Sequence, residues 1–206
     1  MFSVRSLIKV AISAISAAST PPRTGGPAAA RRTVRARAGQ PQPDQVRGLF
    51  DENHALTPLS AWLPALRRAQ PGRFAEVTRL LNRLLAPSGC CVTGETHGGE
   101  CLFERRRVKL PLPALSDGCR ALLTWLGDVL RHLCRVCPPG RQLVAQPGLV
   151  LVDEVDLHLH PQWQMQFLPT LARALPNLQF IVTSHSPLLV GSVEWTNILA
   201  LQSGPR

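Results

Sequence analysis

GLVLVDEVDLHLHP, at residues 148–161, is the stretch that decides the fold of this chain. Its apolar run, Leu149–Val152, is followed at once by two carboxylates, Asp153 and Glu154. A short unbroken apolar run predicts a strand that is buried on both faces, as in the parallel sheet of an α/β protein. Ligands of such sheets bind beyond the carboxyl ends of the strands, where both acids would lie. Two acids at that edge suit the binding of Mg²⁺ and the activation of a water, which phosphoryl transfer requires.

Two further segments flank this stretch: LSDGCR at residues 115–120 and FIVTSHSP at residues 180–187. In chain order, the three segments resemble the signature motif, the Walker B strand with its D-loop, and the switch-histidine strand of ABC-like ATPases. The likeness is closest to the RecF/SMC-related bacterial branch of AAA ATP-binding proteins. Each motif is weak alone, whereas three motifs in the expected order form a specific pattern.

The resemblance implies an α/β fold, namely the C-terminal lobe of an ABC-type P-loop ATPase head, with a parallel sheet flanked by helices. It covers roughly residues 55–201. Residues 1–50 hold eight arginines and lysines against one acid, which accounts for +7 of the net charge of +10. Because residues 20–46 are also rich in Pro, Gly, Ala and Gln, we expect a disordered basic leader over 1–46. A partial ATPase domain would then occupy 47–206.

The resemblance also implies roles for the residues at the strand ends. Asp153 would hold Mg²⁺, and Glu154 would polarise the attacking water as general base. His185 would sense the γ-phosphate of ATP, and Asp156 would belong to the D-loop that bridges two subunits. The cofactors implied are therefore ATP and Mg²⁺.

The signature motif implies a partner subunit. In the family, Ser116 and Gly118 would contact the γ-phosphate of a nucleotide held by the opposite subunit, in a head-to-head homodimer or with a partner ATPase subunit. From the residues themselves, Ser116 is a good helix cap, and a helix N-terminus offers free N–H groups to a phosphate. Cys119 departs from the commoner L-S-x-G-[EQ] form of the motif.

No P-loop is present in the sequence. The only lysines, Lys9 and Lys109, are not preceded by glycine, so the pattern G-x-x-x-x-G-K-[ST] is missing. Two explanations stand: a truncated or frameshifted ATPase, or a lobe supplied by a partner chain. The leader, which is unlike any part of the family head, favours the first. We expect an ATP hydrolase that is inactive in isolation.

Two other functional classes compete with an ATPase lobe. One is a non-catalytic remnant or interaction module. The other is a metal-dependent hydrolase that uses the Asp/Glu/His cluster, because His158 and His160 place two imidazoles two residues apart. Pro161 and the family likeness instead favour structural or interfacial histidines in the D-loop. The pair Cys134 and Cys137 lacks a second ligand pair at zinc spacing, which favours buried thiols.

Composition limits the partners and the compartment. A cytosolic substrate such as ATP predicts a cytoplasmic protein with reduced thiols. No apolar run reaches the length of a membrane span. The basic leader would suit nucleic acid, but no aromatic residue is interleaved in it for base stacking, so the sequence does not show such a partner. The arginine run at 105–107 could bind phosphate but is more typical of a solvated strand edge.

Apolar periodicity predicts the remaining secondary structure. The expected elements are helices over 59–66 and 74–84, short strands within 88–110 around a turn at Gly98-Gly99, a helix from Ser116 to about Arg135, a helix beginning at Pro161, a strand over Leu178–Val182 and a last strand over Asn197–Leu201.

Overall fold

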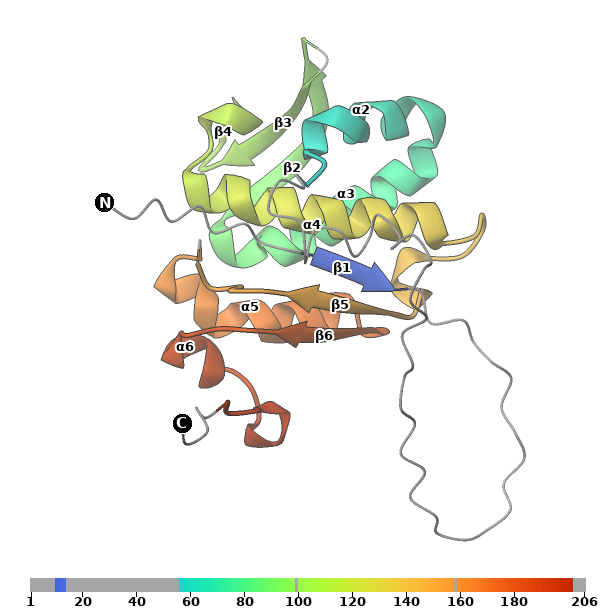
Figure 1. The fold of residues 1–206 in the computed structure, drawn as a ribbon. Helices are drawn as coiled ribbons and strands as arrows, with labels where there is room; N and C mark the ends of the chain where they lie inside the picture. Colours follow the sequence, from blue (N-terminus) through green and yellow to red (C-terminus); the bar gives the residue numbers. More distant parts are fainter. Residues whose placement is uncertain (1–9, 14–55, 99, 158, 202–206) are drawn as a thin grey trace, which may run out of the picture.

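The predicted buried strand forms as β5 (Gly148–Val152) and lies in the middle of a three-stranded sheet with the order β1-β5-β6 (Figure 1). The computed structural model describes residues 10–13, 56–98, 100–157 and 159–201. β6 (Leu178–Val182) runs parallel to β5, with Val150 opposite Phe180. Parallel neighbours require a crossover connection, and α5 (Pro161–Ala174) supplies it. The expected α/β fold is confirmed.

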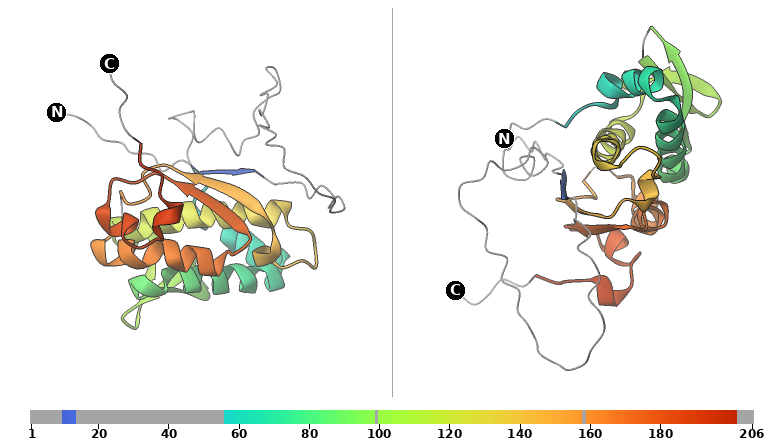
Figure 2. Two further views of the ribbon diagram at one scale, coloured as in Figure 1. Left: turned by 90° about the horizontal axis from the view of Figure 1, so that it is seen from below. Right: turned by 90° about the vertical axis from the view of Figure 1, so that its right-hand side faces the viewer.

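β5 is fully buried on one face only. Val150 and Val152 are 0% and 2% exposed, whereas Leu149 and Leu151 are half-buried. Figure 2 shows α4 and α5 on one face of the sheet. The expectation of equal burial on both faces is therefore wrong for the described residues, because the helices among them cover a single face.

α4 (Asp117–Val136) is the long helix beneath the sheet, and its apolar face follows the predicted period. Trp125 of this helix is 1% exposed and meets Phe167 of α5 edge-to-face, with ring centroids 5.4 Å apart. Such a pair adds about 0.5–1.5 kcal/mol beyond the burial of its area. The residues that complete this face are all buried: Leu122, Leu123, Leu126, Val129, Leu130 and Leu133.

A second layer contains the two expected helices and a small antiparallel sheet. α2 (Leu59–Ala69) and α3 (Pro71–Leu85) are separated at Gln70, and the sheet has the order β2-β3-β4. Asn82 of α3 holds this sheet, because its side chain accepts from the Val92 amide at 2.6 Å and donates to the Val92 carbonyl at 3.1 Å. The strands are β2 (Cys90–His97), β3 (Glu100–Arg105) and β4 (Val108–Pro111).

Within the predicted leader the structure describes only β1 (Val10–Ser13), which pairs antiparallel with β5. These four residues differ from the expectation of disorder. A short apolar segment can satisfy the backbone groups along an open side of β5, which would otherwise remain unpaired. The rest of the leader lies outside the described residues, so its boundary at residue 46 stays a prediction.

The chain after β6 forms the short helix α6 (Pro187–Val190) and a 3₁₀ turn at Trp195–Asn197. The strand expected over Asn197–Leu201 is not formed, so that prediction is wrong. Leu199 and Leu201 alternate as a strand would, but they are 92% and 94% exposed. Neither sheet in the described part of the chain includes this segment, and an isolated strand leaves its backbone groups without partners.

Candidate functional site

The carboxyl ends of β5 and β6 stay joined for one residue beyond each strand. The Thr183 amide donates to the Val152 carbonyl at 3.0 Å, and the Val155 amide donates to the Thr183 carbonyl at 3.1 Å. The Thr183 hydroxyl accepts from the Glu154 amide at 2.8 Å and donates to the Asp153 carboxylate. One threonine thus fixes the Asp153 carboxylate and the Glu154 backbone at the sheet edge. The sequence motifs predict no role for it.

Glu154 has a backbone conformation that is unusual for its type. Its φ is +48°, in the left-handed region that residues other than glycine enter at a cost of about 1–2 kcal/mol. Strain of this kind concentrates at functional sites, where the surroundings hold it in place. Here two hydrogen bonds hold the backbone of Glu154 in place: the Glu154 amide donates to the Thr183 hydroxyl, and the Val155 amide donates to the Thr183 carbonyl. The turn leaves the Glu154 side chain half-buried and Asp153 exposed.

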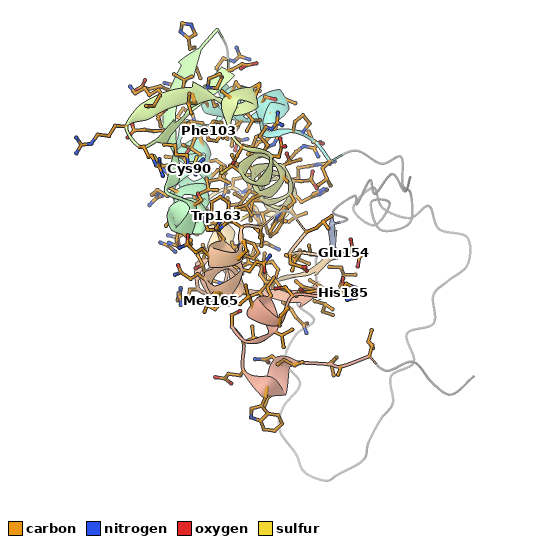
Figure 3. All side chains as sticks on the ribbon, turned by 90° about the vertical axis from the view of Figure 1, so that its left-hand side faces the viewer. Cys90, Phe103, Glu154, Trp163, Met165 and His185 are labelled. Carbon is orange, nitrogen blue, oxygen red and sulfur yellow. The ribbon has the colours of Figure 1, made fainter. Side chains whose placement is uncertain are left out.

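His185 lies at the same edge of the sheet, three residues past the end of β6, and is exposed. Figure 3 looks toward this edge and shows Glu154 and His185 there. The predicted grouping of Asp153, Glu154 and His185 at one sheet edge therefore matches the geometry. Their individual roles in catalysis stay predictions.

Gln164 of α5 holds the loop that follows the acids, and it is a second residue whose role the sequence motifs do not predict. Its side-chain amide donates to the carbonyls of Asp156 and Leu159 at 3.3 and 2.9 Å. Its oxygen accepts from the Ser186 hydroxyl at 2.6 Å. One glutamine thus ties the loop of Asp156 and Leu159, the predicted D-loop segment, to the turn that carries His185.

Asp156 occupies this held loop, and one of its carboxylate oxygens is buried. That oxygen, Oδ1, finds no hydrogen-bond donor in the part of the chain that the structure describes. Buried polar atoms are nearly always paired, and each exception needs an explanation. A donor from outside the described residues would supply one.

Ser116 and Gly118 lie apart from the acids, at the start of α4. Ser116 is exposed and occupies the cap position, but its side chain makes no capping hydrogen bond. Both residues line a groove of about 780 Å³ that is separate from Asp153, Glu154 and His185. The groove is also lined by residues of the D-loop segment, the β3–β4 turn and neighbouring loops: Pro87, Ser88, Gly89, Arg105, Arg106, Leu157, Leu159, His160, Gln162 and Trp163.

Burial keeps at least two of the six cysteines in the neutral thiol form. All six are free, and no cluster of three metal-ligating side chains occurs among the described residues. Burial raises the pKa of Cys90 to about 11, and burial likewise raises the pKa of Cys134 to about 11. Both thiols therefore stay protonated at neutral pH, and a neutral thiol is a poor nucleophile. His158 lies outside the described residues, so the alternative of a metal site there gains no support.

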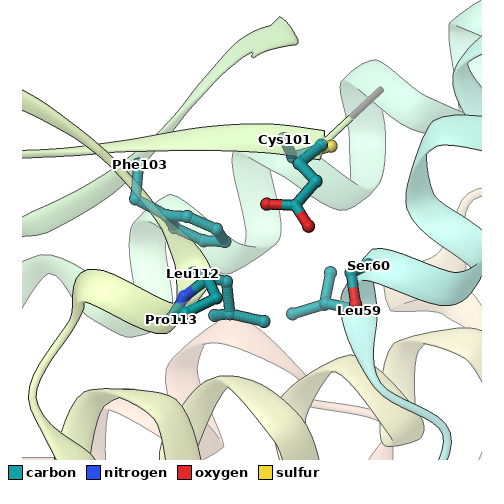
Figure 4. Close-up of a pocket in the computed structure, with 7 residues that line it drawn as sticks. Leu59, Ser60, Cys101, Phe103, Leu112 and Pro113 are labelled. Atoms are coloured by element: carbon teal, nitrogen blue, oxygen red, sulfur yellow. The ribbon is translucent and has the colours of Figure 1, made fainter. Parts of the chain in front are cut away.

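A second cavity lies between α2 and β3 (Figure 4). Its volume is about 50 Å³, and its walls include Leu59, Cys101 and Phe103. It is large enough for a water but far below the 300–1,000 Å³ or so of ligand pockets. Of the helices that the structure describes, none has the length and apolar character to cross a membrane.

Comparison with known proteins gives the family. Residues 36–191 match the family described as "AAA domain, putative AbiEii toxin, Type IV TA system". The chain is 36% identical over 107 residues to the Retron Ec83 probable ATPase of Escherichia coli, covering 52% of this chain and 20% of that protein. It is 40% identical over 79 residues to the Retron Vc95 probable ATPase of Vibrio cholerae serotype O1 biovar El Tor, covering 38% of this chain and 15% of that protein.

A third relative is the Septu protein PtuA of Bacillus mycoides (strain KBAB4), 38% identical over 96 residues. This match covers 46% of the chain and 13% of that protein. The chain thus spans no more than about a fifth of the curated relatives it matches. The family match extends over more than half of the chain and includes residues 115–120, 148–161 and 180–187. The chain belongs to the AAA domain family and is an AAA-type, ATPase-like protein.

Proposed function

We propose that this chain is the part of an ATP-hydrolysing head that supplies the catalytic acids. It becomes competent when a P-loop lobe is provided in trans or in a longer chain. The observation that carries this proposal is the bonding of Thr183 to both Asp153 and Glu154. These bonds hold the Asp153 carboxylate and the Glu154 backbone at the strand ends without any nucleotide.

Each residue at this edge has a distinct part in the proposed reaction. Asp153 binds Mg²⁺, directly or through water, which neutralises charge on the phosphates. Glu154 takes a proton from the attacking water. His185 contacts the γ-phosphate and distinguishes ATP from ADP. MgATP supplies the phosphoryl group, and the cradle for its β- and γ-phosphates comes from the P-loop lobe.

The proposed contacts between subunits come from the start of α4 and the D-loop segment, away from the sheet edge that carries the acids. Ser116 and Gly118 approach the γ-phosphate of a nucleotide held by the opposite subunit, and the D-loop with Asp156 crosses between subunits. Support comes from the groove that these two residues share with the D-loop segment, and from the buried Asp156 oxygen that lacks a donor. A homodimer or a pair with another ATPase subunit satisfies both contacts.

The experiment is a complementation assay. The chain alone should not hydrolyse MgATP, and it should bind MgATP far more weakly than a complex with the P-loop lobe of an intact relative. That complex should hydrolyse MgATP. Asp153→Asn in that complex should weaken Mg²⁺-dependent ATP binding, whereas Glu194→Gln, a change in an exposed acid outside the site, should not. ATP hydrolysis by the chain alone would contradict the proposal.

A non-catalytic interaction module is the second candidate function. The observation that favours it is exposed apolar surface on β6 and in the chain that follows it: Ile181 of β6 is 52% exposed, Val190 42% and Trp195 82%. Large exposed apolar groups that lie near one another mark interaction surfaces. A stable complex with the P-loop lobe that never hydrolyses ATP would select this function over catalysis.

A further inference from the structure

The turn between β3 and β4 places arginines where the backbone disfavours them. Arg105 pairs with Val108, so Arg106 and Arg107 alone form the connection. Their φ angles are +51° and +65°. Two-residue hairpins with positive φ at both positions strongly prefer Asn-Gly, because β-carbons crowd the left-handed conformation. Both positions of this turn nevertheless carry long cationic side chains, although the backbone conformation is costly for them.

Two of the three arginines in this run line the 780 Å³ groove, and the third does not. Arg105 is half-buried and Arg106 is exposed, and both lie in the groove wall. Arg107 is absent from that wall. Arg107 therefore differs from Arg106 in its position relative to the groove, although both share one turn and one backbone conformation.

The groove is suited to an anion. Among the residues that the structure describes, its lining contains two arginines and no acidic residue. The nearest acid in sequence to the signature residues, Asp117, is bonded to Arg120. Ser116, His160 and Gln162 add hydrogen-bonding side chains to the walls. The volume falls within the range of about 300–1,000 Å³ that is typical of small-molecule sites.

We propose that Arg105 and Arg106 bind the phosphate chain of a nucleoside triphosphate in this groove, and that this is the nucleotide which Ser116 and Gly118 approach. Arginine suits this task because its planar fork of N–H donors fits phosphate oxygens in pairs and keeps its charge at all working pH values. The inference deepens the proposed function and rests on it for the identity of the nucleotide. Under this proposal Arg105 and Arg106 bind phosphate and do not belong to a solvated strand edge. Arg107 retains the solvated-edge interpretation.

The test measures binding of inorganic tripolyphosphate to the purified full chain by isothermal titration calorimetry at low salt. Arg106→Asn is the main variant, since asparagine tolerates positive φ and the turn should survive. Arg107→Asn removes the same charge from the same turn and is the matched control. Arg105→Gln tests the second guanidinium. Thermal unfolding of each variant checks that the fold is retained.

We expect Arg106→Asn and Arg105→Gln each to weaken tripolyphosphate binding about tenfold, the usual worth of a charged hydrogen bond. Arg107→Asn should change the affinity less than twofold or so, as expected for an exposed charge outside the contact. Equal losses in Arg106→Asn and Arg107→Asn would overturn the proposal. So would a parent chain that fails to bind tripolyphosphate at millimolar concentration. Binding of a single-stranded oligonucleotide but not of tripolyphosphate, with the same arginine dependence, would assign the groove to a nucleic-acid backbone instead.

This result can be separated from the proposed function. In the complex with a P-loop lobe, Arg106→Asn should slow ATP hydrolysis and weaken ATP-dependent dimerisation while leaving ATP binding to the P-loop lobe unchanged. If tripolyphosphate binding depends on Arg106 but Glu154→Gln leaves hydrolysis unchanged, the groove stands and the catalytic proposal fails. If Glu154→Gln abolishes hydrolysis but Arg106→Asn behaves like Arg107→Asn, the catalytic proposal stands and the groove assignment fails.

Discussion

Replacing Gln164 by leucine removes three hydrogen bonds at once without changing the size of the side chain greatly. Two are the bonds to the carbonyls of Asp156 and Leu159, and the third is the bond from the Ser186 hydroxyl. All three are partly buried. At about 1 kcal/mol net for each bond, we expect the free energy of unfolding to fall by about 2–3 kcal/mol. The leucine recovers part of this only if its methyl groups find apolar contacts.

The same substitution should loosen the D-loop before it unfolds the protein. The carbonyls that lose their donor belong to the segment between the acids and α5. Apart from the bond of the Val155 amide to the Thr183 carbonyl, the backbone bonds of its described residues are short-range turns such as the Leu159 amide to the Asp156 carbonyl at 3.0 Å. Amide hydrogen exchange should therefore become faster over residues 155–160 than in β5. Local opening of this kind is distinct from global unfolding.

The assay compares Gln164→Leu with Gln166→Leu by urea unfolding and by hydrogen exchange. Gln166 lies on the same helix but is exposed, so its replacement should change stability by less than about 0.5 kcal/mol. Equal stability of the two variants, or unchanged exchange over residues 155–160 in Gln164→Leu, would refute the view that this glutamine holds the loop.

Three further predictions concern the acids, the core and the thiols. Thr183→Val keeps the shape of the side chain but removes the hydroxyl that bonds Asp153 and Glu154. Hydrolysis by the complemented enzyme should therefore fall about tenfold or more, with ATP binding retained. Unchanged turnover would show that this hydroxyl does not position the two residues. Gly127→Ala should lower the free energy of unfolding by about 1 kcal/mol, because the new methyl carbon would lie 2.7 Å from the Leu59 side chain. Such overpacking costs more than alanine gains in helix propensity. A more stable variant would contradict this prediction. Because burial raises the pKa of Cys90 and Cys134 from 9.0 to about 11, the folded state holds these protons more tightly than the unfolded state. Their contribution to stability should therefore be complete below pH 9 and be lost between about pH 9 and 11, and neither thiol should react with iodoacetamide at pH 7.5 or so in the folded protein; rapid labelling there would refute this.

The elements that periodicity predicts best are those whose apolar face packs on the core. β5, β6, α4 and α5 each carry an apolar run or a helical stripe that burial then fixes. The grouping of Asp153 and Glu154 with His185 follows as well, because parallel strands bring their carboxyl ends to one edge. Sequence pattern therefore suffices where hydrophobic burial and strand direction decide the position.

Other features depend on contacts that no pattern encodes. β1 needs only four residues and a free side of β5, and its composition does not set it apart from the surrounding segment. Gln164 acts through side-chain bonds to backbone carbonyls, and such bonds leave no periodic trace in a sequence. Arg105 and Arg106 resemble any surface charge run until the two-residue turn and the groove bring them into one lining with Ser116. The strand predicted over Asn197–Leu201 is missing for a different reason. Leu199 and Leu201 alternate as in a strand, but alternation does not form a strand when no neighbouring strand pairs with the segment among the described residues.

Single-turnover ATP hydrolysis by the complemented complex, with and without Glu154→Gln, tests the central claim most directly. Loss of a general base slows the chemical step by roughly 10²–10⁴-fold, whereas ATP binding should persist because Asp153 still holds Mg²⁺. The account predicts that the Glu154→Gln complex binds ATP, hydrolyses it more slowly by that factor and accumulates as an ATP-bound dimer, while Glu194→Gln behaves as the parent. Hydrolysis at the parent rate in the Glu154→Gln complex would contradict the claim that this residue activates the attacking water.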